Sequence, residues 1–554
     1  MDIFFDYILV ALVYSGTALA FLRGLHMFQL NGYKIDKHLK WLVKNPAKSW
    51  SQIAMFIFLY TILLWRYLDS RILDSLQGIP PIGFPKDNLA FISQPAASQI
   101  FVWLFQACFF AAFVIGAISP FINLPLFKAK KPLLYTPRVW RMVAAFSLIL
   151  LGFTVHAVLS AEKTASFLIW ILFLYIFTPL LPIVVSFINL PIEELIRRWF
   201  KKDAQRLLQS CGHLEIIGIT GSYGKTSVKF FLTELLNSRY ETLMTPESYN
   251  TPMGICKTIR GELRGIHQFF VCEMGLSHVG DIEELCDFVK PKHGIITAVG
   301  DQHLATMKTR ENILCEKLAL ARAVTHGMLF VNGDCDKLFE NKPLNAKSYG
   351  LGESNDCFAY AISVSLKGTV FSVNLGGEVF ENLSTPLIGS HNVCNLVGAI
   401  AMARAFGVSE KDIRARLKRL SPPPHRLELK GGGNAVIIDD AFNSNPEGAK
   451  AALETLAMFG GCKILITPGM VELGAAQYSA NFELGKQAAA VCDYVFAVGE
   501  KQAQPILAGL QAAGYPPEKT FSAKTFNEAI AKAQEIPCQG EKIILLENDL
   551  PDNY

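Results

Sequence analysis

The feature that most constrains the fold of this chain is the uneven distribution of its charged residues. Long runs without Asp, Glu, Lys or Arg fall almost entirely within the first 195 residues, at Asn88–Phe127, Met142–Ala161 and Thr164–Pro191. A helix needs about 20 apolar residues to cross the hydrocarbon core of a bilayer, and each run is long enough. Buried helices of a soluble domain are a poor alternative, because so many apolar segments leave too little polar surface to cover them. We therefore expect a membrane domain at this end of the chain.

Two shorter apolar runs, at about 3–22 and 49–66, bring the prediction to about five spans. Lys and Arg gather in the loops after the first, third and fifth spans, and such residues favour the cytoplasmic side. All three loops lie on the same side of the membrane if there are five spans and the N-terminus is outside the cell. The rest of the chain is then expected in the cytoplasm. Asp2 and Asp6 replace the basic start of a signal peptide, so the first span is expected to be retained.

The remainder of the chain has the composition of a soluble protein. A net charge of +4, from 52 basic and 48 acidic residues, is too small to indicate nucleic-acid binding. The twelve cysteines show no regular spacing, and eleven of them lie from Cys211 onward. Because a disulfide scaffold would be short and dense in cysteine, we expect reduced thiols in a cytoplasmic domain.

A glycine-rich loop, Thr220–Ser227, lies between a predicted strand at Leu214–Ile219 and a predicted amphipathic helix at Val228–Leu236. Strand, glycine loop and helix in this order form a cradle for phosphate groups. Its backbone N–H groups approach the phosphates, and the helix N-terminus adds positive potential. Lys225 is expected to reach the terminal phosphates and Thr226 to coordinate Mg²⁺. The loop residues expected to bind nucleotide are Gly221, Ser222, Gly224, Lys225, Thr226 and Ser227.

Three later positions have the chemistry of metal ligands. The apolar strand Phe269–Glu273 ends in a carboxylate, which is the geometry by which phosphate-loop enzymes hold Mg²⁺. His303 follows the predicted strand Gly294–Gly300, and Lys317 lies on the helical stretch Glu311–Val324. Taken alone, this histidine is as well explained as a surface residue and this lysine as a solvated helix residue.

The order of these motifs resembles the Mur ligase family, and within it the MurF-type branch that adds D-alanyl-D-alanine. The family's phosphate loop, glutamate–glycine strand end, metal-binding histidine and carbamylated lysine match Gly218–Ser227, Glu273–Gly275, His303 and Lys317. Its adenine-side motif, acceptor-side asparagine motif and G-x-M-x-E-L-G segment match Gly389–Asn395, Asn250–Gly254 and Gly469–Gly474.

Two further motifs match with changes. The family's arginine before the third domain matches Arg426, but His425 stands where a glycine is usual. Its D-D-x-Y-N-x-N-P motif matches Asp439–Pro446, with Phe442 in place of tyrosine. The resemblance covers about 340 residues in the family's order.

The resemblance implies an ATP-dependent ligase that phosphorylates a carboxylate and lets an amine displace the phosphate. It implies catalytic roles for Lys225, Glu273, His303 and Lys317. It implies ligands for two Mg²⁺ ions at Thr226, Glu273, His303 and carbamylated Lys317. It adds Asn395, Arg426 and Asp440 to the ATP-binding residues. It implies substrate contacts at Asn250, Thr251, Asn443 and Asn445.

The expected architecture is an α-helical membrane domain at 1–198, a central α/β phosphate-loop ATPase domain at 199–420 and a Rossmann-like α/β domain at 421–554. Parallel strands of the last domain are expected at Val436–Asp440, Lys463–Thr467 and Tyr494–Val498.

The sequence departs from the family at the substrate-binding parts. Membrane spans occupy the place of the family's UDP-sugar-binding domain, and the segment Glu547–Tyr554 replaces a Lys-Gly-Ser motif expected after the last strand. We therefore expect a multi-pass ligase of the bacterial inner (plasma) membrane, with cytoplasmic catalytic domains and a lipid-linked or otherwise membrane-presented envelope precursor as substrate. The alternative is the ordinary MurF activity, which adds D-Ala-D-Ala to UDP-MurNAc-tripeptide.

Two rival classes fit less well. A transporter driven by a phosphate-loop ATPase would need an ABC-type signature such as L-S-G-G-Q, which the sequence lacks. A degenerate binding module would not be expected to retain all four of the residues Lys225, Glu273, His303 and Lys317.

For a ligase of this kind, an amino acid or peptide amine is the expected second substrate. No nucleic acid partner is expected.

Overall fold

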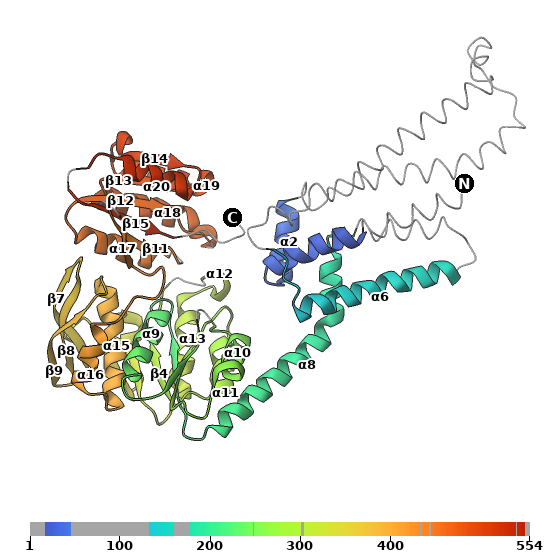
Figure 1. The fold of residues 1–554 in the computed structure, drawn as a ribbon, viewed down its shortest axis with the longest axis horizontal. Helices are drawn as coiled ribbons and strands as arrows, with labels where there is room; N and C mark the ends of the chain where they lie inside the picture. Colours follow the sequence, from blue (N-terminus) through green and yellow to red (C-terminus); the bar gives the residue numbers. More distant parts are fainter. Residues whose placement is uncertain are drawn as a thin grey trace, which may run out of the picture. The chain divides into compact units, whose positions relative to one another are not determined.

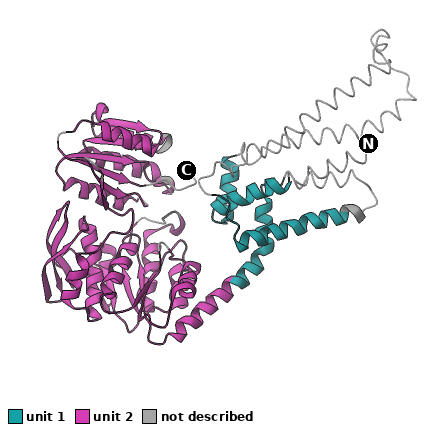
Figure 2. Ribbon diagram, viewed as in Figure 1, with its two compact units in different colours: residues 1–196, 553 teal, residues 197–552, 554 magenta. Residues whose placement is uncertain are grey.

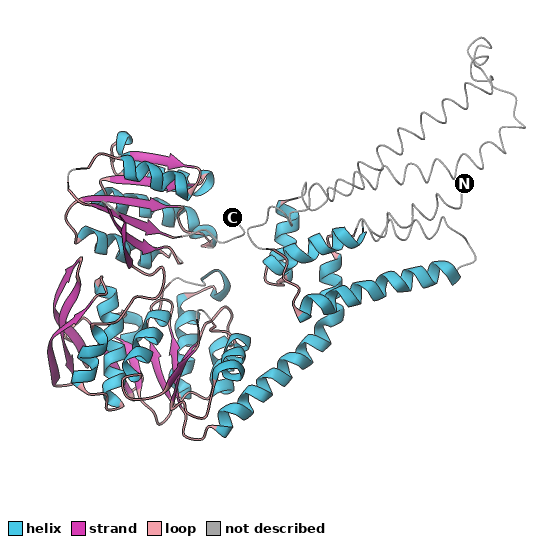
Figure 3. Ribbon diagram, viewed as in Figure 1, coloured by secondary structure: helices cyan, strands magenta, loops and turns pink. Residues whose placement is uncertain are grey.

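The computed structural model describes residues 17–45, 132–159, 177–246, 249–300, 304–432, 435–442, 445–471, 473–538 and 540–548. The chain divides into two compact units, residues 1–196 and 197–552 (Figure 2). In the described part of the chain, unit 1 is helical and both β-sheets belong to unit 2 (Figure 3). Two predicted site residues, His303 and Asn443, lie outside the described residues.

Unit 1 contains a helix at 17–30, α2 (Ile35–Lys44), α6 (Pro137–Leu159) and the first part of α8 (Leu181–Ser210). Its core joins these elements, and the rings of Phe21 and Phe146 stack with centroids 3.9 Å apart. An ion pair of 2.7 Å between Arg141 and Glu193 links α6 to α8. These contacts hold together helices that are far apart in the sequence.

One helix of the described residues, Pro137–His156 within α6, is long and apolar enough to cross a membrane by length and composition. It contains most of the span predicted at Met142–Ala161. The predicted spans at 49–66 and 88–127 lie outside the described residues, and those at 3–22 and 164–191 do so in part. The prediction of five spans therefore remains a prediction.

The first sheet of unit 2 has nine strands in the order β2-β3-β1-β4-β5-β6-β7-β8-β9. Pairing is parallel from β2 to β7 and antiparallel from β7 to β9. The strands are β1 (Glu215–Thr220), β2 (Thr242–Met244), β3 (Phe269–Glu273), β4 (His293–Ile296), β5 (Leu329–Asn332), β6 (Ala346–Gly350), β7 (Cys357–Ser365), β8 (Gly368–Leu375) and β9 (Glu378–Thr385). The strands predicted at Leu214–Ile219 and Phe269–Glu273 are confirmed as β1 and β3.

Helices cover both faces of this sheet, which explains why its central strands are apolar throughout. The helices are α9 (Lys225–Leu236), α10 (Pro252–Glu262), α11 (Asp281–Val289), α12 (Leu304–Met307), α13 (Arg310–Ala323), α14 (Asp336–Glu340), α15 (Ser390–Ala405) and α16 (Glu410–Leu417) (Figure 1). Successive side chains of a strand point to opposite faces, so Ile217 and Ile219 enter one core while Ile216 enters the other.

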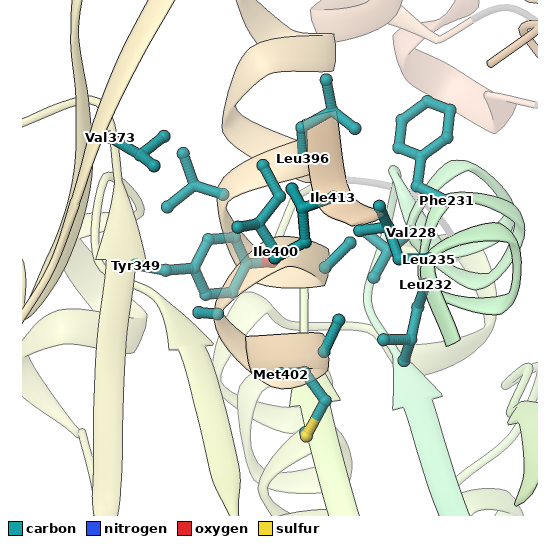
Figure 4. Packing of buried hydrophobic residues seen from close by; sticks show 14 of the residues in the cluster. Val228, Phe231, Leu232, Leu235, Tyr349, Val373, Leu396, Ile400, Met402 and Ile413 are labelled. Atoms are coloured by element: carbon teal, nitrogen blue, oxygen red, sulfur yellow. The ribbon is translucent and has the colours of Figure 1, made fainter. Parts of the chain in front are cut away.

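Helix α15 is buried on nearly every side because it packs between α9 and strands of the sheet. Its Leu396 and Ile400 lie between Val228 and Leu235 of α9 and the ring of Tyr349 on β6 (Figure 4). Such a helix is apolar around its whole circumference and has no solvent face. This packing fixes the N-terminal ends of both helices beside the phosphate loop.

The second sheet has six strands in the order β10-β11-β15-β12-β13-β14, and only the β10–β11 pair is antiparallel. The strands are β10 (Glu428–Gly432), β11 (Ala435–Asp440), β12 (Cys462–Thr467), β13 (Tyr494–Val498), β14 (Thr520–Ala523) and β15 (Lys542–Glu547). The helices are α17 (Pro446–Ala457), α18 (Gln477–Val491), α19 (Glu500–Ala512) and α20 (Phe526–Glu535), with short 3₁₀ helices at Gly474–Ala476 and Pro517–Lys519. The three parallel strands predicted for this domain are confirmed as β11, β12 and β13.

The prediction that all cysteines of the catalytic part are reduced is wrong for one pair. Cys462 and Cys538 form a disulfide with their Cα atoms 5.9 Å apart, although 76 positions separate them in the sequence. The sheet explains the pairing, because β12 and β15 are neighbouring strands. Cys462 on β12 is in register with Lys542 on β15, and Lys542 follows Cys538 closely in the sequence. Sequence spacing gives no sign of this adjacency.

Candidate active site

The glycine loop lies between the end of β1 and the start of α9, as the sequence predicts, but the helix begins at Lys225, three residues before the predicted start. Gly224 caps this helix with φ +80°, a backbone conformation that favours glycine. A Cβ atom at Gly224 would lie 2.6 Å from Asn395 Oδ1, so a larger residue has no room there. Glycine therefore suits both the backbone conformation and the space at this position of the loop.

Hydrogen bonds from Ser222 fix the loop against the segment that follows β4. Its backbone N–H donates to Ala298 O over 2.8 Å, and its hydroxyl oxygen accepts from the N–H of Gly300 over 2.8 Å. On the other side, Lys225 Nζ donates to Gly221 O over 2.6 Å. Lys225 therefore folds back over the loop. A phosphate bound in the loop would lie beside its ammonium group.

Burial, opposed by Glu273 and reinforced by Arg426, lowers the pKa of Lys225 to about 8. A phosphate would favour the charged form of this lysine, because an opposite charge stabilises an ammonium group. In the absence of a ligand, Lys225 is a cation that gives up its proton near neutral pH more readily than an exposed lysine does.

Glu273 lies at the centre of the contacts around the loop, with a side chain that is 2% exposed. Its Oε2 accepts from Thr226 Oγ1 over 3.1 Å and lies 3.0 Å from Lys229 Nζ. Its Oε1 accepts from Asn250 Nδ2 over 3.1 Å. Burial acts to raise the pKa of Glu273, but Lys229 and Lys225 outweigh it, so the pKa lies below its ordinary value. The carboxylate is thus held in its ionised form.

Lys229 is a residue that the sequence analysis missed. It is almost completely buried on α9, one helical turn after Lys225, and it forms the closest ion pair to the carboxylate of Glu273. Two signals in the sequence could have revealed it. The spacing of four residues places both lysines on one face of the helix, and a lysine among apolar helix positions requires a partner.

Lys317 of α13 is fully buried, and its Nζ has no hydrogen-bond partner among the described residues. Burial, reinforced by the charge of Lys225, lowers the pKa of Lys317 well below its usual value. A buried ammonium group without a partner is costly, so the neutral amine is favoured. The charge of Lys225 acts on the pKa of Lys317, so Lys317 lies near the lysine of the phosphate loop.

Arg426 and Phe442 bring the C-terminal part of unit 2 to the loop. The Nη2 atom of Arg426 donates to Thr226 Oγ1 over 3.5 Å, and its guanidinium lies 4.6 Å from the centre of the Phe442 ring. Burial lowers the pKa of Arg426, while Glu273 and Asp440 act to raise it. The phenylalanine found in place of the family's tyrosine thus retains the aromatic face on which the arginine rests.

The other change from the family pattern has a local explanation. His425 has φ +59°, in the left-handed region that favours glycine. Its Nδ1 lies 2.8 Å from Asp439 Oδ2, an oxygen that also accepts from Lys430 Nζ. These contacts offset the strain that a histidine has at this position.

Two predicted substrate residues have other contacts in this structure. Thr251 Oγ1 accepts from the N–H of Gly254 and caps α10, while Asn445 Oδ1 accepts from the N–H of Gly448 and caps α17. Asn395 lies at the phosphate loop beside Gly224. The structure brings together Lys225, Thr226, Glu273, Asn250, Asn395 and Arg426, with Lys317 close by.

Comparison with known families agrees with this geometry. The Mur ligase middle domain matches residues 219–403, and the Mur ligase glutamate ligase domain matches residues 425–547. Together the two matches cover more than half of the chain. They correspond to the nine-stranded and six-stranded sheets with their helices.

Similar proteins include two ligases named UDP-N-acetylmuramoyl-tripeptide–D-alanyl-D-alanine ligase. The one from Bacillus subtilis is 32% identical over 286 residues, which are 51% of this chain and 62% of the relative. The one from Escherichia coli is 28% identical over 334 residues, 58% of this chain and 72% of the relative. The match thus spans less than two thirds of the Bacillus subtilis protein.

Similar solved structures include MurF from Acinetobacter baumannii, with a TM-score of 0.57 and 27% identity over 64% of this chain and 77% of the other. MurF ligase from Thermotoga maritima in complex with ADP gives a TM-score of 0.56 with 25% identity, covering 64% of this chain and 80% of the other. The chain therefore carries two domains of the Mur ligase family, a Mur ligase middle domain followed by a Mur ligase glutamate ligase domain.

Proposed function

We propose that this chain is an ATP-dependent ligase that joins a carboxylate to an amine through an acyl phosphate. The observation that supports it most strongly is the meeting of Glu273 and Arg426 at Thr226, the residue after the phosphate-loop lysine. Carboxylate, hydroxyl and guanidinium groups from two domains thereby converge where the phosphates of ATP would lie. Similarity to proteins named as MurF ligases supports the same activity.

In the proposed reaction the residues act mainly through their charges. Lys225 binds the terminal phosphates, and Arg426 stabilises negative charge that develops as the phosphoryl group moves to the carboxylate. Lys229 and Asn250 keep the carboxylate of Glu273 ionised and oriented. When bound, Mg²⁺ would neutralise charge on the transferring phosphates.

The residues present fit a magnesium site. Thr226 and Glu273 offer oxygen ligands of the kind that Mg²⁺ prefers. His303 remains a predicted ligand, since it lies outside the described residues. Lys317 fits if it is carbamylated, since a free amine favoured by burial can add CO₂ with loss of one proton. The resulting carbamate is an anion that would balance Lys225 and supply oxygen ligands.

The substrates named by the relatives are the first to test, namely UDP-N-acetylmuramoyl-tripeptide as donor and D-alanyl-D-alanine as acceptor. Similarity to proteins with these names favours the ordinary MurF activity over a lipid-linked donor. Peptidoglycan precursor synthesis is the corresponding role in the cell.

A second candidate is a donor presented at a membrane. The helix Pro137–His156 favours it, because this segment is long and apolar enough to span a bilayer. So do exposed apolar side chains along α8, including Phe187, Ile188 and Leu195, which a lipid environment would cover. In this proposal the protein is anchored in the bacterial inner membrane, its catalytic domains face the cytoplasm and unit 1 binds a lipid-linked precursor.

Phosphate release by the full chain in detergent separates these possibilities. Release with UDP-MurNAc-tripeptide and D-Ala-D-Ala supports the ordinary MurF activity, whereas release only with lipid-linked precursors supports the membrane-presented donor. Lys411, an exposed lysine of α16, provides a matched control, since Lys225→Ala should lower release by about 10²–10³-fold and Lys411→Ala should not lower it. Phosphate release by Lys225→Ala within a few-fold of the parent would refute the proposed ligase.

A further inference from the structure

Helix α2 (Ile35–Lys44) of unit 1 presents an exposed apolar row. His38 and Leu42, four residues apart, are buried, and the residue that follows each of them is exposed. Leu39 is 42% exposed and Val43 is 79% exposed. Because residues four apart lie on one side of a helix, Leu39 and Val43 form an apolar row beside the buried one.

A third row of α2 is basic. Lys37, Lys40 and Lys44 follow one another at spacings of three and four residues, so they share one side of the helix, and all three are exposed. Asp36 is the one acidic residue of this helix. Exposed apolar and basic rows on the same helix are typical of a helix that lies in the plane of a membrane surface.

Contacts of the buried row fix how α2 is turned. His38 Nε2 lies 3.3 Å from Pro179 O, and His38 Nδ1 lies 3.4 Å from Asn31 Nδ2. The rings of Phe28 and Trp41 pack against the imidazole, with centroids 5.1 and 5.9 Å from its centre. The buried side of α2 is therefore held in unit 1, and the apolar and basic rows remain on its surface.

The position of α2 in unit 1 also fits a membrane surface. The segment Pro137–His156, which is long and apolar enough to cross a bilayer, begins beside the residues that lead into α2. The guanidinium of Arg138 lies 4.2 Å from the centre of the Tyr33 ring, and Gln29 Nε2 donates to Leu134 O over 2.9 Å. Helix α2 therefore starts at one end of the apolar segment, where a bilayer changes from hydrocarbon to headgroups.

Two other occupants of this surface are less favourable. A second copy of this chain, related by a two-fold axis, would bring the basic row against itself, and like charges repel across an interface. A free phosphate would contact the lysines but would leave the apolar row exposed. An anionic membrane surface covers both rows at once.

We propose that α2 is an interfacial helix that binds anionic phospholipids of the cytoplasmic leaflet. Leu39 and Val43 enter the boundary between headgroups and acyl chains, and the basic row binds the phosphates. This docking goes beyond the proposed ligase reaction and uses none of its residues. It rests on the proposed placement of Pro137–His156 in a bilayer.

The test measures binding of fluorescently labelled phosphatidylglycerol to the full chain in a neutral detergent, with equally labelled phosphatidylcholine as the matched zwitterionic probe. At low salt, phosphatidylglycerol is expected to bind about tenfold or more tightly, because each lysine at an anionic surface contributes about fivefold. Salt at about 0.5 M should remove most of this preference, since it screens exposed charges. Equal binding of the two lipids, binding of neither, or displacement of phosphatidylglycerol by millimolar inorganic phosphate would overturn the proposal.

A triple variant of the basic row, Lys37→Gln, Lys40→Gln and Lys44→Gln, is expected to lose the preference for phosphatidylglycerol. The matched control replaces three exposed lysines of unit 2 and should keep the preference. The control changes are Lys411→Gln, Lys418→Gln and Lys450→Gln. A basic-row variant that still prefers phosphatidylglycerol would contradict the docking site.

Leu39→Asn combined with Val43→Asn tests the apolar row. Binding of both lipids should weaken by a similar factor of about tenfold, because apolar contact is lost whatever the charge of the headgroup. Leu344→Asn, at a fully exposed leucine of unit 2, is the control and should leave binding unchanged. Unchanged binding in the double variant would show that the apolar row does not enter the lipid, contrary to the proposal.

These outcomes are distinguishable from a failure of the proposed function. Lipid binding is measured without ATP or substrates, so a chain that releases no phosphate can still bind phosphatidylglycerol through α2. A chain that releases phosphate but does not distinguish the two lipids shows that the docking site alone is wrong.

Discussion

Two carboxyl groups of unit 2, at the ends of β3 and β11, have different surroundings. Glu273, at the end of β3, is surrounded by amines and contacts Lys229 directly. Asp440, at the end of β11, is buried beside its register partner Glu547, and burial outweighs the effect of Arg426 and raises its pKa to about 6. Amines keep the first carboxylate ionised, whereas burial favours the protonated form of the second carboxyl group. Arg426 interacts electrostatically with both groups, and its Nη2 atom donates to Thr226 at the phosphate loop.

The largest effect that tests this comparison is expected from Lys229→Met. Removing one partner of a buried ion pair costs about 3–5 kcal/mol, because the other charge remains buried. The denaturation midpoint of the full chain should therefore fall sharply for Lys229→Met and hardly at all for Lys411→Met, at an exposed helix position. Adding Glu273→Gln should restore part of the loss, and a Lys229→Met protein as stable as the parent would show that the pair is not structural.

Lys225→Ala tests the phosphate loop through its effect on ATP turnover. Removing a charged group that stabilises the transferring phosphoryl group costs about 10²–10³-fold in rate. ATP turnover should fall by this amount while the fold is kept, since among the described residues the ammonium group of Lys225 hydrogen-bonds to carbonyl oxygens of its own loop, those of Gly221 and Ser222. Turnover within a few-fold of the parent would mean that the loop does not act on phosphates.

The sequence predicts those parts of the two sites that depend on neighbouring residues. It does not predict those that depend on contacts between distant segments. The phosphate loop, β3 and its terminal Glu273 follow from adjacent residues, since a buried parallel strand is a continuous apolar run and the glycine pattern is short. The contact between Lys229 and Glu273 needs α9 to lie beside β3, and no short segment encodes that. The start of α9 was placed three residues late because glycine and lysine were assigned to the loop alone.

The C-terminal sheet was predicted less completely for a topological reason. Apolar runs in the sequence predict the strands β11, β12 and β13. The sequence of a single strand does not determine which strands lie next to it in the sheet. Because β15 inserts between β11 and β12, it brings Glu547 to Asp440 and the segment before β15 to Cys462. Both the carboxyl pair and the disulfide follow from that single insertion.

The pH dependence of ATP use gives a smaller effect that sharpens the comparison. The pKa of Lys225 is lowered to about 8, so its charge is present below that pH and is lost above it. Between about pH 7 and pH 9 the charged fraction falls about tenfold, and kcat/KM for ATP should fall with it, since this ratio reports the free enzyme. Lys225→Arg should remove this decline because arginine stays charged. A decline that persists in Lys225→Arg would belong to another group.

The smallest effect concerns the contact that holds Arg426 between the two sites. Its guanidinium lies 4.6 Å from the centre of the Phe442 ring, which is 49% exposed. A cation–π contact at an exposed position contributes about 0.5–1 kcal/mol, so Phe442→Leu should lower kcat/KM for ATP by about two- to fivefold. Phe442→Tyr should retain the activity because it keeps the aromatic face. Phe339→Leu, at an exposed phenylalanine of α14, is the matched control. If Phe442→Leu has no effect, Arg426 is positioned by Thr226 and the neighbouring acids alone, and the link between the two sites is purely electrostatic.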